Sequence, residues 1–137
     1  CSTNIPTYWP LHGNCKKRLI EYGLMDKILN NKNIKILPPK DYLTFINHLA
    51  KCSLIICDGG SLQEESLIFK KPCIILRKAT ERPEGLESNF QFLSKLDVEK
   101  TKKKIGKYLH EDFKVEEFEN PYGEKGLSKT IVEFLLK

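Results

Sequence analysis

The sequence lacks several features that would assign the protein at once to a particular class. No stretch contains the roughly 18 consecutive apolar residues that a membrane-spanning helix needs, so we expect no membrane partner. The N-terminus has no basic segment followed by an apolar run, which argues against a secretory signal peptide. The single methionine is Met25, so the chain begins without an initiator methionine, and we expect that its first residue is not a natural start.

Metal-binding patterns are also missing. The five cysteines include no C-x-x-C pair, and the three histidines are scattered along the chain. Zinc sites need such residues clustered at short spacing, so we expect no metal and no other cofactor. The cysteine count is odd, and Cys57 and Cys73 lie in or beside apolar runs, where free thiols behave as small hydrophobic residues. We therefore expect a reducing, cytoplasmic compartment.

The net charge of +5 is a mild excess of basic residues, part of it in the segment Lys100-Thr101-Lys102-Lys103-Lys104. This segment is either a patch that binds anions or nucleic acid, or a solvated helix face. No aromatic or glycine-rich RNA-binding signature interleaves with these lysines. The solvated face is therefore favoured, and no nucleic-acid partner is expected.

Short apolar runs alternate with amphipathic segments of helical spacing along the chain. The runs predict strands over residues 6–11, 34–37, 54–57, 72–76 and 90–93. The amphipathic segments predict helices over residues 16–30, 41–50, 62–69, 98–110 and 127–136, with a loop over 77–89. This alternation predicts an α/β fold, a Rossmann-like parallel sheet of about five strands with helices on both faces.

Ligands of open α/β sheets bind beyond the carboxyl ends of the strands. Four segments follow predicted strands and are expected along one edge: 12–14, 38–40, 58–61 and 77–84. The sharpest is the turn of Gly59, Gly60 and Ser61, because a buried strand enters it and a helix leaves it directly. Unpaired N–H groups at a helix start attract anions, and glycines let a phosphate approach them. The turn predicts a diphosphate cradle, although paired glycines before a helix are also common in ordinary turns.

Charged residues near this turn have two interpretations each. Glu64 and Glu65 complement the helix dipole, or one of them accepts hydrogen bonds from a ribose diol. Arg77 and Arg82 in the following loop bind phosphate, or pair with carboxylates of the loop, and both interpretations can hold together.

Two further residues are ambiguous in the same way. His12, at the end of a predicted strand, is either structural or part of a site. Phe45 is either a core residue or a platform on which a base stacks.

Several motifs occur in a fixed order: Asp58-Gly59-Gly60-Ser61-Leu62-Gln63-Glu64-Glu65, Lys71-Pro72, Arg77, Thr80-Glu81-Arg82-Pro83-Glu84 and Asn120-Pro121-Tyr122-Gly123. This series resembles the C-terminal domain of UDP-N-acetylglucosamine 2-epimerases, both hydrolysing and non-hydrolysing. The segments Tyr42-Leu43-x-Phe45 and Pro10-x-His12-x-Asn14 also resemble that family. The resemblance covers nearly the whole chain.

The resemblance implies a two-domain, glycosyltransferase-B-like enzyme whose active site lies in the interdomain cleft. Its C-terminal domain would hold UDP or a UDP-N-acetylhexosamine. By position, Phe45 would stack on uracil, Glu65 would bind ribose, and Gly59, Gly60 and Ser61 would cradle the diphosphate.

The remaining implied roles concern the cleft and the parent enzyme. His12 matches a family histidine that is sometimes linked to a regulatory second nucleotide-sugar site, and Arg77, Arg82 and Glu84 would shape the cleft. The parent enzyme would be a cytoplasmic homodimer that serves polysaccharide biosynthesis.

The sequence also departs from the family pattern. The family usually has Asp-Ser-Gly-Gly where this chain has Asp58-Gly59-Gly60-Ser61, so the hydroxyl has moved two positions while the backbone N–H groups remain. The family's catalytic acidic residues lie in the N-terminal domain, and a cleft histidine in a His-Arg-x-Glu-Asn segment opens the C-terminal domain. Neither occurs in this sequence, so we assign no catalytic residue to it.

We therefore expect the UDP-sugar-binding domain of an enzyme that interconverts UDP-N-acetylglucosamine and UDP-N-acetylmannosamine by eliminating and re-adding UDP. Elimination needs a general base at C2 and stabilisation of the departing diphosphate. The chain supplies only the stabilisation of the diphosphate and no general base, so it is expected to be inactive alone. Two alternatives remain: the nucleotide-sugar-binding half of a glycosyltransferase, and a non-catalytic nucleotide-binding module.

The domain organisation follows from the same resemblance. Residues 1–137 are expected to form a single nucleotide-sugar-binding domain, a fragment that lacks the N-terminal domain and the first βα unit. Residues 6–11 would then be the second strand of the parent domain, with one edge unpaired.

Overall fold

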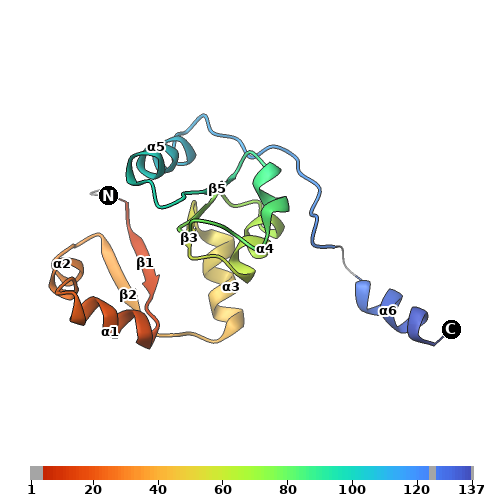
Figure 1. Cartoon of the computed structure of the whole chain (residues 1–137), viewed down its shortest axis with the longest axis horizontal. Helices are drawn as coiled ribbons and strands as arrows, with labels where there is room; N and C mark the ends of the chain where they lie inside the picture. The colour runs from red at the N-terminus through yellow and green to blue at the C-terminus, as the bar shows by residue number, and fades with distance from the viewer. Residues whose placement is uncertain (1–4, 124–125, 137) are drawn as a thin grey trace. The chain divides into compact units, whose positions relative to one another are not determined.

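The computed structural model describes residues 5–123 and 126–136 (Figure 1), so the predictions that concern Cys1 lie outside the described residues. The chain divides into two compact units, Cys1–Asn47 and His48–Lys137. The helix α3 (Tyr42–Lys51) spans the boundary between them. Each unit is described by itself.

The first unit contains a pair of parallel strands, β1 (Thr7–Pro10) and β2 (Ile34–Leu37), with Thr7 opposite Ile34. Two helices, α1 (Gly13–Glu21) and α2 (Met25–Leu29), connect them where the sequence predicted one. The break lies at Gly23, whose φ is +63°. The Leu24 N–H bonds to the Leu19 carbonyl and the Gly23 N–H to the Ile20 carbonyl, the pattern that ends a helix at a left-handed glycine.

The first turn of α3 has the cap that its sequence predicts. The Asp41 side chain accepts hydrogen bonds from the backbone N–H of Thr44 at 3.0 Å and from the Thr44 hydroxyl at 2.7 Å. These bonds lower the pKa of the Asp41 carboxyl. The cap satisfies N–H groups that a helix start otherwise leaves without partners.

The second unit contains a three-stranded parallel sheet in the order β3-β4-β5. The strands are β3 (Ile55–Cys57), β4 (Cys73–Ile75) and β5 (Gln91–Leu93). The helix α4 (Ser61–Ile68) connects β3 to β4, and a 3-10 helix, η1 (Pro83–Glu87), lies between β4 and β5 where the sequence predicted only a loop. The helices α5 (Val98–Tyr108) and α6 (Leu127–Leu135) follow. The α/β class and the five parallel strands are thus confirmed, with the strands distributed between two sheets.

The core of the second unit surrounds β4. Its three residues are 0% exposed, as an apolar strand covered on both faces should be. Ile105 and Tyr108 of α5 pack with Ile74. Asp97, predicted as the cap of α5, accepts a hydrogen bond from the Lys100 N–H at 2.9 Å. The central strand is therefore held by the helix that follows the sheet.

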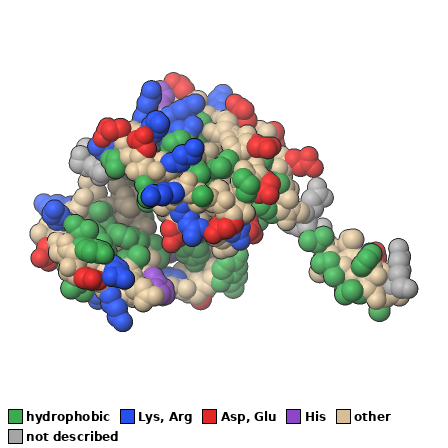
Figure 2. All heavy atoms as spheres, in the orientation of Figure 1, with side chains coloured by type: hydrophobic (Ala, Val, Ile, Leu, Met, Phe, Trp, Pro, Cys, Tyr) green, Lys and Arg blue, Asp and Glu red, His purple; other side chains and the backbone are tan. Residues whose placement is uncertain are grey.

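The surfaces of the last two helices differ in character (Figure 2). The α5 lysines Lys102 and Lys103 are exposed, as the solvated-face interpretation predicted, whereas Lys104 lies over the rings of Phe92 and Tyr108. The helix α6 instead exposes apolar side chains, including Phe134, which is 76% exposed. No helix in the described ranges is long and apolar enough to cross a membrane.

Tyr108 gives a direct test of this core. It is 4% exposed, its hydroxyl has no hydrogen-bond partner among the described residues, and burial raises its pKa. A buried hydroxyl without a partner costs about 1–3 kcal/mol. We expect Tyr108→Phe to raise the free energy of unfolding by about 1 kcal/mol in urea titrations, because the ring keeps its contact with Phe113. Tyr122→Phe, which removes a bonded hydroxyl, is the control and should lower it; a loss of stability in Tyr108→Phe would contradict the assignment.

Candidate functional site

The turn between β3 and α4 requires its two glycines. Gly59 has a φ of +106° and Gly60 a φ of +74°, conformations that residues with a Cβ rarely adopt. Gly60 is the N-cap of α4, and no side chain caps the helix there. Ser61 begins the helix and is exposed. The start of α4 therefore presents backbone N–H groups and the positive end of the helix dipole at the carboxyl end of β3.

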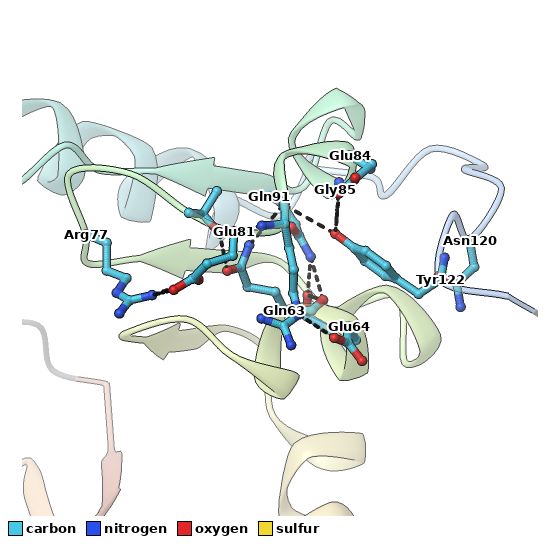
Figure 3. A network of polar contacts seen from close by, with 12 residues as sticks. Gln63, Glu64, Arg77, Glu81, Glu84, Gly85, Gln91, Asn120 and Tyr122 are labelled. Carbon is cyan, nitrogen blue, oxygen red and sulfur yellow. Dashed lines mark hydrogen bonds and ion pairs between the residues drawn. The ribbon is translucent and has the colours of Figure 1, made fainter.

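Arg77 follows β4 and lies against this turn. A Cβ on Gly59 would come within 3.2 Å of Arg77 Cδ and 3.3 Å of Arg77 Nη1. The same Nη1 donates to both carboxylate oxygens of Glu81 at 2.8 Å (Figure 3). The pKa of Glu81 is lowered, first by a hydrogen bond with its own backbone and then by Arg77. The predicted pairing inside the loop is present, and it leaves Arg77 beside Gly59.

The two glutamates of α4 have different surroundings. Glu64 forms an ion pair with Nε of Arg82, and this contact is the main cause that raises the pKa of Arg82. Both side chains are about a third exposed, at 35% and 31%. Glu65 is instead buried, with 8% of its surface exposed. The structure thus assigns Glu64 to the attachment of the loop after β4, and the ribose role of Glu65 stays a prediction.

Gln63 belongs to the same network, and the sequence did not identify it as a functional residue. It is 0% exposed, and its Oε1 accepts a hydrogen bond from the Thr80 hydroxyl at 2.6 Å. Its Nε2 lies 3.4 Å from the Arg82 carbonyl oxygen. A signal did exist in the sequence, because a glutamine in the first turn of a helix between two buried strands needs polar partners.

A second glutamine extends the network into the sheet. Nε2 of Gln91, in β5, donates to the Gln63 carbonyl and to the Ser66 hydroxyl, each at 2.7 Å. Its Oε1 lies so close to Gly85 that a Cβ there would overlap with it. The first turn of α4, strand β5 and η1 are therefore fixed against one another by buried polar contacts.

Tyr122 attaches the Asn120–Gly123 motif to the same loop (Figure 3). Its hydroxyl accepts a hydrogen bond from the Gly85 N–H at 3.3 Å and lies 3.3 Å from the Arg82 carbonyl and 3.4 Å from Glu84 Oε2. Burial is the first cause that raises the pKa of Tyr122. Residues far apart in the sequence therefore meet at the loop that carries Arg82 and Glu84.

Among the predicted residues of the second unit, Gly59 lies against Arg77. Arg82 and Glu84 meet at the Tyr122 hydroxyl. Gly60, Ser61 and Glu65 belong to the turn and helix that follow β3. His12 and Phe45 belong to the first unit. His12 is the exposed N-cap of α1, where its Nδ1 accepts a hydrogen bond from the Asn14 N–H at 3.3 Å. Phe45 is half-buried in α3. The participation of these two residues in a common site stays a prediction.

The arrangement suits an anion with several oxygen atoms. It combines the start of a helix, a turn in which two glycines leave room at the backbone, and a loop with two arginines. Among the described residues, no group of three or more His, Cys, Asp or Glu side chains could hold a metal ion.

The family model described as UDP-N-acetylglucosamine 2-epimerase matches residues 2–136. The UDP-N-acetylglucosamine 2-epimerase of Methanococcus maripaludis is 39% identical over 93% of this chain and 34% of its own length. That of Methanocaldococcus jannaschii is 40% identical over 91% of this chain and 33% of its own length.

Solved structures give the same result. The Methanocaldococcus jannaschii enzyme in complex with UDP-GlcNAc and UDP has a TM-score of 0.86 at 38% identity, over 96% of this chain and 35% of that one. The Neisseria meningitidis epimerase bound to UDP-GlcNAc has a TM-score of 0.65 at 29% identity, over 96% of this chain and 36% of that one. This chain spans about a third of the length of these relatives. It belongs to the UDP-N-acetylglucosamine 2-epimerase family, as its motifs predicted.

Proposed function

We propose that this chain is the UDP-sugar-binding part of an enzyme that interconverts UDP-N-acetylglucosamine and UDP-N-acetylmannosamine. The observation that carries the proposal is the Gly59–Ser61 turn at the start of α4 with Arg77 beside it, in a chain of this family. A relative solved with UDP-GlcNAc and UDP supports the same ligand class here.

In the proposed reaction, UDP leaves C1 of the sugar as a proton is removed from C2, and a C1=C2 double bond forms. A proton then adds to the opposite face of C2 as UDP adds back to C1, which gives the epimer. Negative charge grows on the diphosphate as the C1–O bond breaks. The N–H groups at the start of α4 stabilise that charge in a fixed geometry, which lowers the barrier to departure. Arg77 is close enough to the turn to assist. The general base is expected from the longer protein, so the isolated chain should bind without turning over.

The remaining site residues complete this proposal. Phe45 stacks on uracil, and Glu65 accepts hydrogen bonds from the ribose hydroxyls. His12, Arg82 and Glu84 line the cleft, and His12 contributes to a regulatory second site. The position of these residues in the family motifs is the support for their roles.

We also propose that the chain is a single nucleotide-sugar-binding domain that lacks the first βα unit and the N-terminal domain of a longer protein. Doubly wound sheets have the strand order 3-2-1-4-5-6. Without the first strand, the second pairs only with the third, and the fourth, fifth and sixth pair in sequence. The pairing of β1 with β2 and the order β3-β4-β5 agree with that pattern. The coverage of about a third of the relatives supports it as well.

The parent enzyme is proposed to be a cytoplasmic homodimer. The compartment rests on the cysteine pattern of the sequence: the count is odd, and Cys57 and Cys73 are buried in apolar surroundings, where thiols behave as small hydrophobic residues. The homodimer rests on the resemblance to the family alone.

Isothermal titration calorimetry tests the proposal. The folded 137-residue chain should bind UDP and UDP-N-acetylglucosamine, and it should bind ADP at least tenfold more weakly if uracil is recognised. It should not convert either sugar nucleotide. Binding of neither uridine nucleotide by a chain with a cooperative unfolding transition would contradict the function. If the chain bound UDP but did not bind UDP-N-acetylglucosamine, the glycosyltransferase alternative would be favoured.

A further inference from the structure

One attachment of the loop after β4 to α4 has no role assigned by the motifs: the hydroxyl of Thr80. The Thr80 hydroxyl donates to Gln63 Oε1 at 2.6 Å and accepts from the Arg82 N–H at 3.2 Å. One hydroxyl therefore uses both its donor and its acceptor capacity to connect helix and loop. Thr80 is half-buried, between the two arginines in sequence.

The partner of this hydroxyl is itself immobile. Gln63 is 0% exposed, and the Gln91 side chain holds its backbone carbonyl at 2.7 Å. Gln63 Oε1 also lies 3.4 Å from the position that a Cβ on Gly59 would take. Thr80 is thus bonded to a rigid group at the glycine turn itself, and its position limits where the loop can lie.

The arginines on either side depend on this attachment. Toward the start of the loop, Arg77 lies against Gly59 and pairs with Glu81. Toward its end, Arg82 pairs with Glu64 of α4. The Arg77–Glu81 pair is exposed, and such a pair alone contributes little to positioning. The Arg82–Glu64 pair is about a third exposed and holds the end of the loop. Thr80 bonds to the fully buried Gln63 and so links the segment between the two arginines to α4.

We propose that Thr80 is a positioning residue for diphosphate binding: through Gln63 it holds the loop after β4 so that Arg77 stays at the Gly59–Ser61 turn. It acts through other residues and does not touch the nucleotide. This inference rests on the proposed function, because the ligand it concerns is the diphosphate of a uridine nucleotide.

The test compares Thr80→Val, which keeps the shape and removes the hydroxyl, with Thr80→Ser, which keeps the hydroxyl. Thr80→Val should weaken UDP binding about tenfold, the value of one hydrogen bond. Uridine binding, followed by NMR shifts, should not change, because uridine has no phosphate. Thr80→Ser should bind UDP like the parent chain. Thr80→Ala is a second variant with the same expected loss, in case valine beside Gln63 impairs folding.

Several results would overturn the inference: unchanged UDP affinity in Thr80→Val, an equal loss for UDP and uridine, or no recovery in Thr80→Ser. If the unsubstituted chain binds no uridine nucleotide, the proposed function is contradicted, whereas the role of Thr80 in holding the loop can still be tested. Hydrogen exchange provides that test. Exchange of the Arg82 amide, which bonds to the Thr80 hydroxyl, should accelerate about tenfold in Thr80→Val. Exchange of the β4 amides should stay the same. Unchanged exchange at Arg82 would show that Thr80 does not hold the loop.

Discussion

Gly59→Ala is expected to remove most of the UDP affinity and to lower the free energy of unfolding by about 1–3 kcal/mol. Gly59 has a φ of +106°, where a residue with a Cβ is strained. The new Cβ would also lie 3.2 Å from Arg77 Cδ and 3.4 Å from Gln63 Oε1. Arg77 would have to shift by a few tenths of an ångström, and the backbone of the turn would be strained.

Gly60→Ala separates the strain of the backbone from the displacement of Arg77. Gly60 has a φ of +74°, but a Cβ there would meet no atom within 4 Å. Its backbone cost should resemble that of Gly59→Ala, while Arg77 keeps its place. If the start of α4 holds the diphosphate, both variants lose UDP affinity, because the added methyl group covers the backbone that the phosphate must approach.

Gly106→Ala is the matched control. Gly106 lies inside α5, where a Cβ would also meet nothing within 4 Å and no positive φ is required. Alanine is favoured over glycine in a helix interior, so this variant should gain about 0.5–1 kcal/mol of stability. Its UDP affinity should equal that of the parent chain. Urea denaturation and calorimetry on the three variants measure these effects. Full UDP affinity in Gly60→Ala would exclude the turn as the phosphate site.

The sequence was sufficient for much of the fold because local patterns determine it. The run Leu54-Ile55-Ile56-Cys57 predicts a strand buried on both faces, and β3 lies within it. The burial was predicted wrongly for one face, because Ile56 is 47% exposed. Asp41 and Asp97 predict two helix starts because an N-cap acts within three residues. The division of residues 16–30 into two helices was missed, since apolar spacing continues across Gly23 and only the backbone shows that this glycine is left-handed.

The site was predictable where its chemistry is local, and not where it depends on packing. Glycines before a helix and arginines in a loop after a strand indicate an anion site by their positions in the sequence. The contacts of Thr80 with Gln63, and of Tyr122 with Gly85, join residues 17 and 37 positions apart. No periodicity encodes such pairs, because they depend on how β4, β5 and η1 pack against α4. The sequence therefore indicated the groups for a ligand, but not the groups that hold them in place.

Glu65→Gln is expected to weaken UDP binding by roughly tenfold to a hundredfold, because hydrogen bonds to a charged group are worth about 1.5–3 kcal/mol. Glutamine keeps the size of the side chain, and it replaces one acceptor oxygen of the carboxylate with a donor. Glu65 is 8% exposed, so the conservative change also limits damage to the packing of α4. Calorimetry with UDP measures the loss.

A comparison with 2′-deoxy-UDP assigns the effect to the ribose. The parent chain should bind UDP more tightly than the deoxy compound, and Glu65→Gln should remove that difference, so the two changes are not additive. Glu64→Gln is the neighbouring control: it breaks the ion pair with Arg82 but should preserve the discrimination between the two ligands. If Glu65→Gln weakened the binding of UDP and of 2′-deoxy-UDP equally, Glu65 would stabilise the helix and would not bind the ribose. If Glu65→Gln removes the discrimination and Glu64→Gln does not, the ribose lies against the buried carboxylate of Glu65. That carboxylate is about one helical turn beyond the glycines, so the diphosphate then lies at the start of α4.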